Sequence, residues 1–155
     1  MTSFNHEIEI GAPIEYVFEW GITPENWARA MPALIDYEVI EETAEGIHFR
    51  NTIKMLGRTT TSNEIFTVDE ENHRTVSVFD DEDMSGEMVY EYTETEDGTI
   101  VRMHGELEAG TSLFDRALMP VLSRYMNRQF GISLTTMKEL IEAEYAILQQ
   151  AVVEA

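Results

Sequence analysis

The stretch HEIEIGAPIEYVFEW, residues 6–20, changes its hydrophobic period in the middle. Up to Ile10, apolar and polar residues alternate, which is the period of a half-buried strand. The segment Gly11–Pro13 interrupts this pattern, and Pro13 suits the first turn of a helix. Beyond it, the residues that share one helical face are Ile14, Val17 and Phe18. The stretch therefore predicts a strand that turns directly into a helix.

Residues 23–32 predict a second short helix, and the rest of the sheet begins only after it. Thr23 can cap this helix, Pro24 takes its first position, and Pro32 ends it. Alternating segments separated by turns follow, and Asp97–Gly98 is a strong hairpin signal. Short strands in series predict an antiparallel meander. The expected strands cover residues 34–42, 46–55, 58–68, 74–79, 87–94 and 99–108.

An amphipathic stripe in the C-terminal third predicts one long helix. Its apolar residues step by three or four from Phe114 to Leu148. Ser112 and Asp115 form a possible capping box, and Pro120 is expected to kink or delay the helix. Only the apolar face of the meander is large enough to cover this stripe. We therefore expect one α+β domain over residues 1–155, with two short helices between the first two strands and a curved antiparallel sheet of about seven strands around the long helix.

The composition excludes several classes of protein. The chain has 30 Asp and Glu but 10 Lys and Arg, a formal net charge of −20. No basic patch is available to neutralise the phosphates of a nucleic acid. There is no cysteine for a disulfide or a thiolate metal site. No apolar run suits stable membrane insertion, and residues 1–7 lack the features of a secretory signal, so we expect a cytoplasmic protein.

The acidity has two explanations. An acidic site could recognise a basic partner, or the surface could be adapted to high salt, where screening removes the repulsion among carboxylates. The acidic residues are spread over the whole chain rather than gathered at one end. This distribution favours adaptation to high salt.

The order of the elements resembles that of the START-like (SRPBCC) superfamily, which has the helix-grip fold. The resemblance rests on the first strand, on GAPIEYVFEW (residues 11–20), on the short helix with Trp27, on the meander, and on a long helix that contains MKELIEAE (residues 137–144). It covers nearly the whole chain. Polyketide cyclases/dehydrases, lipid-transfer proteins and coenzyme Q-binding proteins are similar in this way. The resemblance implies a cavity for an apolar ligand between the sheet and the long helix.

Strand alternation and helix periodicity indicate which side chains face this cavity. Trp27 and Met31 are expected at its mouth. Several of the nine methionines are expected on its walls, where their flexible side chains adapt to irregular ligands. The predicted ligand-binding residues are Trp27, Met31, Tyr37, Phe49, Asn51, Ile53, Met55, Phe66, Met88, Tyr90, Tyr92, Met103, Phe114, Leu118, Leu122 and Met126, with Phe130 facing them. The alternative interpretation is that these side chains only fill a core.

Few polar groups are expected inside the cavity. Asn51 and the tyrosine hydroxyls could orient a carbonyl or a phenol, or could be satisfied by backbone or water. Polyketide aromatase/cyclases, which are similar in fold, place an arginine on a middle strand that faces the pocket. Here Arg58 stands only at the start of such a strand, and Arg102 is expected to face solvent. A pocket without a cation is poorly equipped to stabilise an enolate.

Two further candidate sites have simpler explanations. His6 is the one histidine on an apolar strand face, and no acid or nucleophile is evidently paired with it, so a structural role is favoured. The segment DDEDMSGE, residues 80–87, resembles the start of a calcium loop. However, the position of the bidentate glutamate is occupied by Tyr92, and strands flank the segment. We expect an acidic hairpin turn and no metal site.

Three functions follow from these observations. The leading hypothesis is a non-catalytic protein that binds or carries a small hydrophobic molecule, such as a lipid, isoprenoid, quinone or polyketide, with no cofactor and no catalytic residue. The second is a polyketide cyclase/dehydratase-like enzyme that acts through tyrosine and asparagine hydrogen bonds. The third is an interaction module of the chaperone-activator type, which shares the fold. A fold by itself does not decide among them.

The charge distribution predicts that salt stabilises the protein. Added KCl screens the repulsion within a chain of net charge −20, so the melting temperature should rise from low to molar KCl. Thermal unfolding followed by circular dichroism measures this directly. A melting temperature that stays flat over the same range would contradict adaptation to high salt.

Overall fold

A seven-stranded antiparallel sheet and one long helix form the fold, which is α+β as expected. The computed structural model describes residues 1–154. The sheet order is β1-β7-β6-β5-β4-β3-β2, so the first strand joins the last strand of the meander. In chain order, the elements are β1 (Thr2–Ile10), α1 (Ile14–Gly21), α2 (Pro24–Ala30), β2 (Leu34–Thr43), β3 (Gly46–Met55), β4 (Arg58–Asp69), β5 (Arg74–Asp80), β6 (Met84–Glu94), β7 (Thr99–Ala109) and α3 (Leu113–Glu154).

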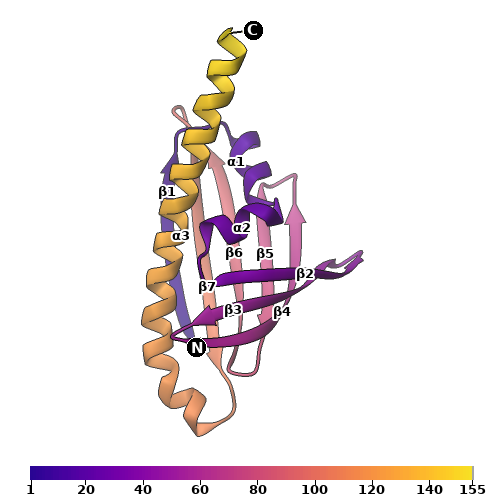
Figure 1. The fold of residues 1–155 in the computed structure, drawn as a ribbon, viewed down its shortest axis with the longest axis vertical. Coiled ribbons are helices and arrows are strands. Elements are labelled where there is room, and N and C mark those ends of the chain that lie inside the picture. Colours follow the sequence, from indigo (N-terminus) through magenta and orange to yellow (C-terminus); the bar gives the residue numbers. More distant parts are fainter. Residues whose placement is uncertain (155) are drawn as a thin grey trace.

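The sheet is strongly curved, and α3 lies along one side of it. In Figure 1, β2 and β3 run across the view whereas β1, β5, β6 and β7 run along it. The short helices α1 and α2 lie at the concave side, between β1 and β2 in the sequence. This arrangement confirms the helix-grip architecture predicted from the order of elements. In residues 1–154, no helix is both long enough and apolar enough to cross a membrane.

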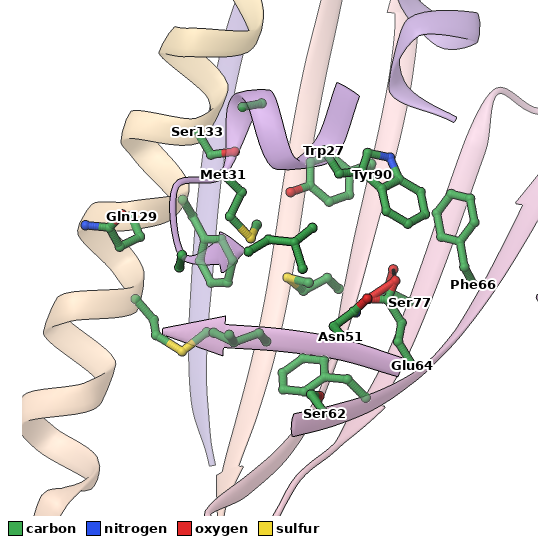
Figure 2. Close-up of a pocket in the computed structure, with 18 of the residues that line it drawn as sticks. Trp27, Met31, Asn51, Ser62, Glu64, Phe66, Ser77, Tyr90, Gln129 and Ser133 are labelled. Atoms are coloured by element: carbon green, nitrogen blue, oxygen red, sulfur yellow. Dashed lines mark hydrogen bonds between the residues drawn. The ribbon is translucent and has the colours of Figure 1, made fainter. Parts of the chain in front are cut away.

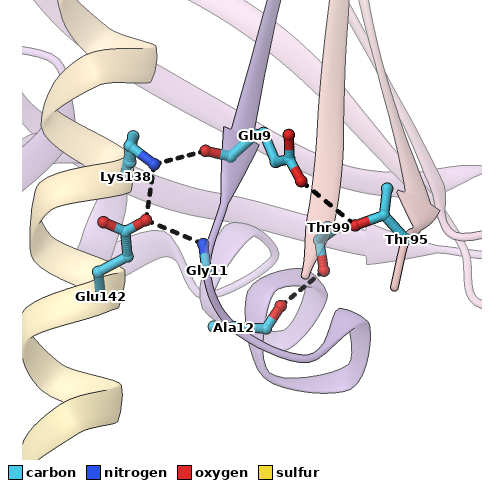
Figure 3. A network of polar contacts seen from close by, with 7 residues as sticks. All are labelled: Glu9, Gly11, Ala12, Thr95, Thr99, Lys138 and Glu142. Carbon is cyan, nitrogen blue, oxygen red and sulfur yellow. Dashed lines mark hydrogen bonds and ion pairs between the residues drawn. The ribbon is translucent and has the colours of Figure 1, made fainter. Parts of the chain in front are cut away.

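The corner after β1 is attached both to the sheet and to α3. The Thr99 hydroxyl donates to the carbonyl oxygen of Ala12 at 2.8 Å, and the Gly11 amide donates to Glu142 Oε1 at 2.9 Å. Lys138 Nζ bridges Glu142 and the carbonyl oxygen of Glu9 (Figure 3). Because these bonds join β1, β7 and α3, the Gly11–Pro13 corner fixes where the long helix crosses the sheet.

The two short helices differ slightly from expectation. Thr23 occupies the N-cap position of α2, but its hydroxyl donates to the carbonyl oxygen of Glu19 at 2.7 Å instead of capping the helix. The last helical residue is Ala30, two positions before Pro32. Ala33, in the α2–β2 connection, is buried and lines the cavity described below.

Only the middle of α3 is covered by the sheet. The Asp115 amide donates to the Ser112 hydroxyl at 3.0 Å, and Pro120 lies inside the helix instead of delaying it. A helix of 42 residues is about 63 Å long, whereas a strand of at most 12 residues spans about 40 Å. The expectation that Phe114 faces the sheet is therefore wrong, since this side chain is 64% exposed beyond the covered segment. The buried residues of α3 are Phe130, Ser133, Leu134, Met137 and Ile141.

Substitutions of two glycines test how the first strand and α3 are packed in the fold. A Cβ on Gly98 would lie 2.1 Å from the carbonyl oxygen of Ile10, so Gly98→Ala must displace the corner. We expect a loss of about 2 kcal/mol in the free energy of unfolding, the range of local overpacking. On Gly131 a Cβ would lie 3.4 Å from the His6 ring, an ordinary contact, and Gly131→Ala should gain up to about 1 kcal/mol from helix propensity. Urea unfolding of both variants measures these changes, and equal effects of the two would contradict the arrangement of the corner.

Candidate functional site

A cavity of about 150 Å³ lies between α3, the α2 segment and the concave face of β3–β6. Figure 2 shows α3 on one side, with Ser133 directed towards the cavity, and the sheet residues opposite. Most of the lining is apolar. Both tryptophans of the chain, Trp20 and Trp27, contribute to it.

An aromatic cluster forms one wall. Trp27 packs edge-on against Phe66 and Phe49, with ring centroids 4.7 and 5.1 Å apart. Its indole Nε1 donates to the carbonyl oxygen of Gly21 at 2.8 Å, which fixes the ring over the sheet. Tilted aromatic pairs of this kind add stability beyond the burial of their area. The wall is therefore a fixed surface against which a flat ligand could pack.

The structure brings together many of the residues predicted for the cavity. Those that line it are Trp27, Met31, Asn51, Ile53, Met55, Phe66, Met88, Tyr90, Tyr92 and Met126, together with Phe130. Met84 and Met137 also line the cavity, although the sequence analysis did not predict them there. Strand alternation therefore identified seven of the fourteen strand residues in the lining, and none of those on β5.

Six predicted residues do not line the cavity. Phe49 is completely buried beneath Trp27, and Tyr37 packs against Phe49 with ring centroids 6.1 Å apart. Met103 is 1% exposed within the core. The other three belong to the N-terminal turns of α3, before Met126, the first residue of α3 in the lining: they are Phe114, Leu118 and Leu122.

A buried carboxyl group is the feature that the sequence analysis missed. Glu64 on β4 is 8% exposed and lines the cavity. Asn51 Nδ2 donates to Glu64 Oε2 at 3.1 Å, and the Ser77 hydroxyl donates to Glu64 Oε1 at 3.4 Å (Figure 2 labels all three). These side chains, with Ser62, form a polar cluster on an otherwise apolar wall. We call Asn51, Ser62, Glu64 and Ser77 the polar cluster below.

The strand pattern of β4 contains a signal that places Glu64 on the cavity face. Ser62, Glu64 and Phe66 are two residues apart on β4 and therefore share one face of the sheet. Phe66 was assigned to the cavity, so the same alternation placed the carboxyl there. Asn51, opposite Ser62 in the β3–β4 register, was already recognised as a polar residue on an apolar face. Charged side chains are seldom buried, so alternation alone does not predict a buried acid at Glu64.

Burial determines the protonation of this cluster. Removal of the carboxyl from water raises the pKa of Glu64 to about 7, although the hydrogen bonds from Asn51 and Ser77 act in the opposite direction. Burial, and then the neighbouring charge of Glu64, raise the pKa of Tyr90 far above its usual value, so this phenol stays neutral. The cavity thus contains a carboxyl group that can give or take a proton near neutral pH and a phenol that remains a hydrogen-bond donor.

The positive charges lie outside the cavity. Arg58 pairs with Asp83 at 3.1 Å, and Arg102 pairs with Glu7 at 2.8 Å on the exposed face, as expected for Arg102. Among the described residues, none of those that line the cavity is an arginine or lysine. The described wall therefore offers neutral hydrogen bonds and two carboxyl groups, those of Glu64 and Asp81, but no guanidinium for an anion or enolate.

The two other candidate sites, His6 and the acidic turn at residues 80–87, form hydrogen bonds that have a structural role. His6 is half-buried and bonds Asn127 of α3 at 2.8 Å, so it joins β1 to the helix. In the acidic turn, Asp81 Oδ1 accepts the amides of Asp83 and Met84 at 2.8 and 2.9 Å. Within residues 1–154, no group of three or more histidine or acidic side chains is placed to hold a metal ion.

Solved structures with the same fold are numerous. TTHA0849 from Thermus thermophilus is 19% identical and covers 92% of this chain and 99% of its own, with a TM-score of 0.81. The Zhui aromatase/cyclase from Streptomyces sp. R1128 is 13% identical, covers 91% and 93%, and has a TM-score of 0.82. A START superfamily protein from Mycobacterium smegmatis is 12% identical, covers 94% and 98%, and has a TM-score of 0.68. At identities of 12–19%, these likenesses show that the chain has the helix-grip fold.

The sequence profile of one family matches residues 1–142. The chain belongs to this family, described as polyketide cyclase / dehydrase and lipid transport. Among curated proteins, none matches the sequence. The family description covers both enzymes and carriers, so the function of this chain has to be argued from its own cavity.

Glu64 should make the stability depend on pH in an unusual direction. Its pKa is about 7 in the folded state and near 4.5 in the unfolded chain, so the folded state binds the extra proton between these values. The stabilisation is complete at low pH and is lost as the pH rises towards 7. The side chain of Glu64→Gln does not titrate, so the variant does not lose this stability. From pH 5.5 to pH 8, its free energy of unfolding should therefore rise by about 2 kcal/mol relative to that of the wild type.

Urea unfolding at several pH values measures the difference between variant and wild type. Glu38→Gln, at an exposed position on β2, is the matched control and should follow the wild-type profile with a constant offset. A constant offset for Glu64→Gln as well would show that the carboxyl titrates normally and is not held in an apolar wall.

Proposed function

We propose that this protein binds a small hydrophobic molecule in the cavity between α3 and the sheet, and does so without catalysis. The observation that carries the proposal is the cavity itself, walled by Trp27, Phe66 and several methionines. Burial of apolar ligand surface against such a wall is favourable at about 25 cal/mol per Å². Methionine side chains allow the wall to adapt to the shape of the ligand.

The volume of the cavity indicates the size of the ligand. Dry apolar cavities near 150 Å³ accept a single aromatic ring, and typical sites for larger ligands begin near 300 Å³. At about 150 Å³, this cavity suits one ring or two fused rings. A long acyl or isoprenoid chain is larger than this space. We therefore favour a compact ring compound as the ligand.

The proposed contacts come from both sides of the cavity. On the sheet side they are Ile53, Met88 and Tyr90, and on the helical side they are Met31 and Met126. Trp27 and Phe66 would pack against the flat face of the ring, because aromatic pairs prefer offset or edge-on contacts. Phe49 and Tyr37, which lie outside the lining, would act by supporting this wall.

A polyketide cyclase/dehydratase-like enzyme is the second candidate, and Glu64 favours it. A carboxyl with a pKa of about 7 is suited to general acid–base catalysis near neutral pH. The family description includes cyclases and dehydrases. A substrate would accumulate on an inactive variant, so a molecule extracted from purified Glu64→Gln should lose water when it is incubated with the wild type and stay unchanged with Glu64→Gln. An unchanged molecule with both proteins supports binding alone.

A substitution that fills the cavity should prevent binding. Ser133 on α3 is buried and directed towards the cavity, so Ser133→Phe places a ring in the proposed ligand volume (Figure 2). We expect affinity for 2-naphthol, a compact two-ring probe, to fall at least tenfold. Isothermal titration calorimetry measures the dissociation constants.

The matched control is Thr135→Phe, which adds the same ring on the exposed side of α3. This variant should bind 2-naphthol as the wild type does. Circular dichroism establishes that both variants are folded. Undiminished binding by folded Ser133→Phe would place the ligand elsewhere and contradict the proposed function.

A further inference from the structure

Two buried polar atoms in the polar cluster have no partner in the described chain. They are Asn51 Oδ1 and Ser62 Oγ, and each has less than 1 Å² of its surface exposed. Asn51 is 5% exposed and Ser62 1% exposed, and both line the cavity. A buried polar group without a hydrogen bond is costly, and the great majority in native proteins are satisfied. These two atoms therefore point to a polar group that belongs to the ligand.

The contact with Glu64 determines which atom of Asn51 is free. The amide nitrogen donates to Glu64 Oε2, so the amide oxygen is the part that lacks a partner. Glu64 is held in turn by the Ser77 hydroxyl. Asn51 thus offers one acceptor, and Ser62 offers a hydroxyl that can donate. The carboxyl of Glu64 acts here as a positioning group for the amide.

Register places the two free atoms on neighbouring strands. Asn51 on β3 is directly opposite Ser62 on β4, and their side chains share the concave face. The Cβ atoms of such a pair lie about 5 Å apart, which is close enough for one small group to contact both. In Figure 2 the labelled side chains of the polar cluster gather at the sheet side of the cavity, away from Gln129 and Ser133.

We infer that Asn51 and Ser62 form a subsite for a hydroxyl group carried by the ring ligand. This inference rests on the proposed function. The ligand hydroxyl donates to Asn51 Oδ1 and accepts from the Ser62 hydroxyl, so one group satisfies both atoms. A carbonyl could accept from Ser62 but would leave Asn51 Oδ1 unpaired, and a methyl group would leave both atoms unpaired. The ligand class is therefore a phenol or a compact cyclic alcohol.

Two probes of similar shape test the subsite. 2-Naphthol carries a hydroxyl where 2-methylnaphthalene carries a methyl group, and transfer out of water alone favours the methyl compound. We expect the wild type to bind 2-naphthol at least tenfold more tightly in calorimetric titrations. Ser62→Ala should reduce this ratio to threefold or less by weakening 2-naphthol binding, with little change for 2-methylnaphthalene.

Two further variants complete the test. Thr61→Ala, on the exposed face of the same strand, should keep the full ratio. Asn51→Leu should reduce the ratio as Ser62→Ala does, and if Asn51→Leu does not fold, Ser62→Ala decides alone. Equal binding of the two probes by the wild type, or an unchanged ratio in Ser62→Ala, would overturn the subsite and leave the proposed function standing. Failure of the wild type to bind either probe would overturn both.

Discussion

Packing of the apolar middle of α3 against the concave face of the sheet is the interaction on which the rest of the structure depends. Without this helix, the inner faces of β1, β6 and β7 would be open to water. Without the sheet, the buried residues Phe130, Leu134 and Ile141 would have no partner. The hydrogen bonds from Gly11 and Lys138 fix the crossing point at one end. Where α3 diverges from β3–β5, the space between them is the cavity.

The cavity combines an apolar wall with a buried carboxyl group, which is unfavourable in free energy. Burial of a carboxyl is unfavourable unless the group is protonated or hydrogen-bonded, and Glu64 meets this cost with a raised pKa and with two donors. A core without function would gain by replacing Glu64 and Asn51 with apolar residues of similar size. A polar cluster that leaves Asn51 Oδ1 and Ser62 Oγ without partners is instead expected of the proposed binding site.

Much of this fold could be predicted from the sequence because the two-residue period of the strands and the 3.6-residue period of the helices are both clear in the hydrophobic pattern. The change of period at Gly11–Pro13 located the first strand and helix, and the hairpin signal at Asp97–Gly98 joined the last two strands. The apolar stripe on the long helix required a large apolar partner. The limits also have physical reasons. Periodicity shows which face of α3 is apolar but not how much of it is covered, so Phe114 was misplaced. Alternation shows that Phe49 points inward but not that Trp27 lies over it, and the rarity of buried acids concealed Glu64.

Methyl NMR of the methionines tests most directly whether the cavity is the ligand site. Of the nine methionines, those that line the cavity are Met31, Met55, Met84, Met88, Met126 and Met137. The others, Met1, Met103 and Met119, do not line it and serve as internal controls. With ¹³C-methyl methionine, titration with 2-naphthol should shift the six cavity signals strongly and leave the three controls nearly unchanged. Shifts confined to the controls, or no saturable shift of the six, would contradict the account.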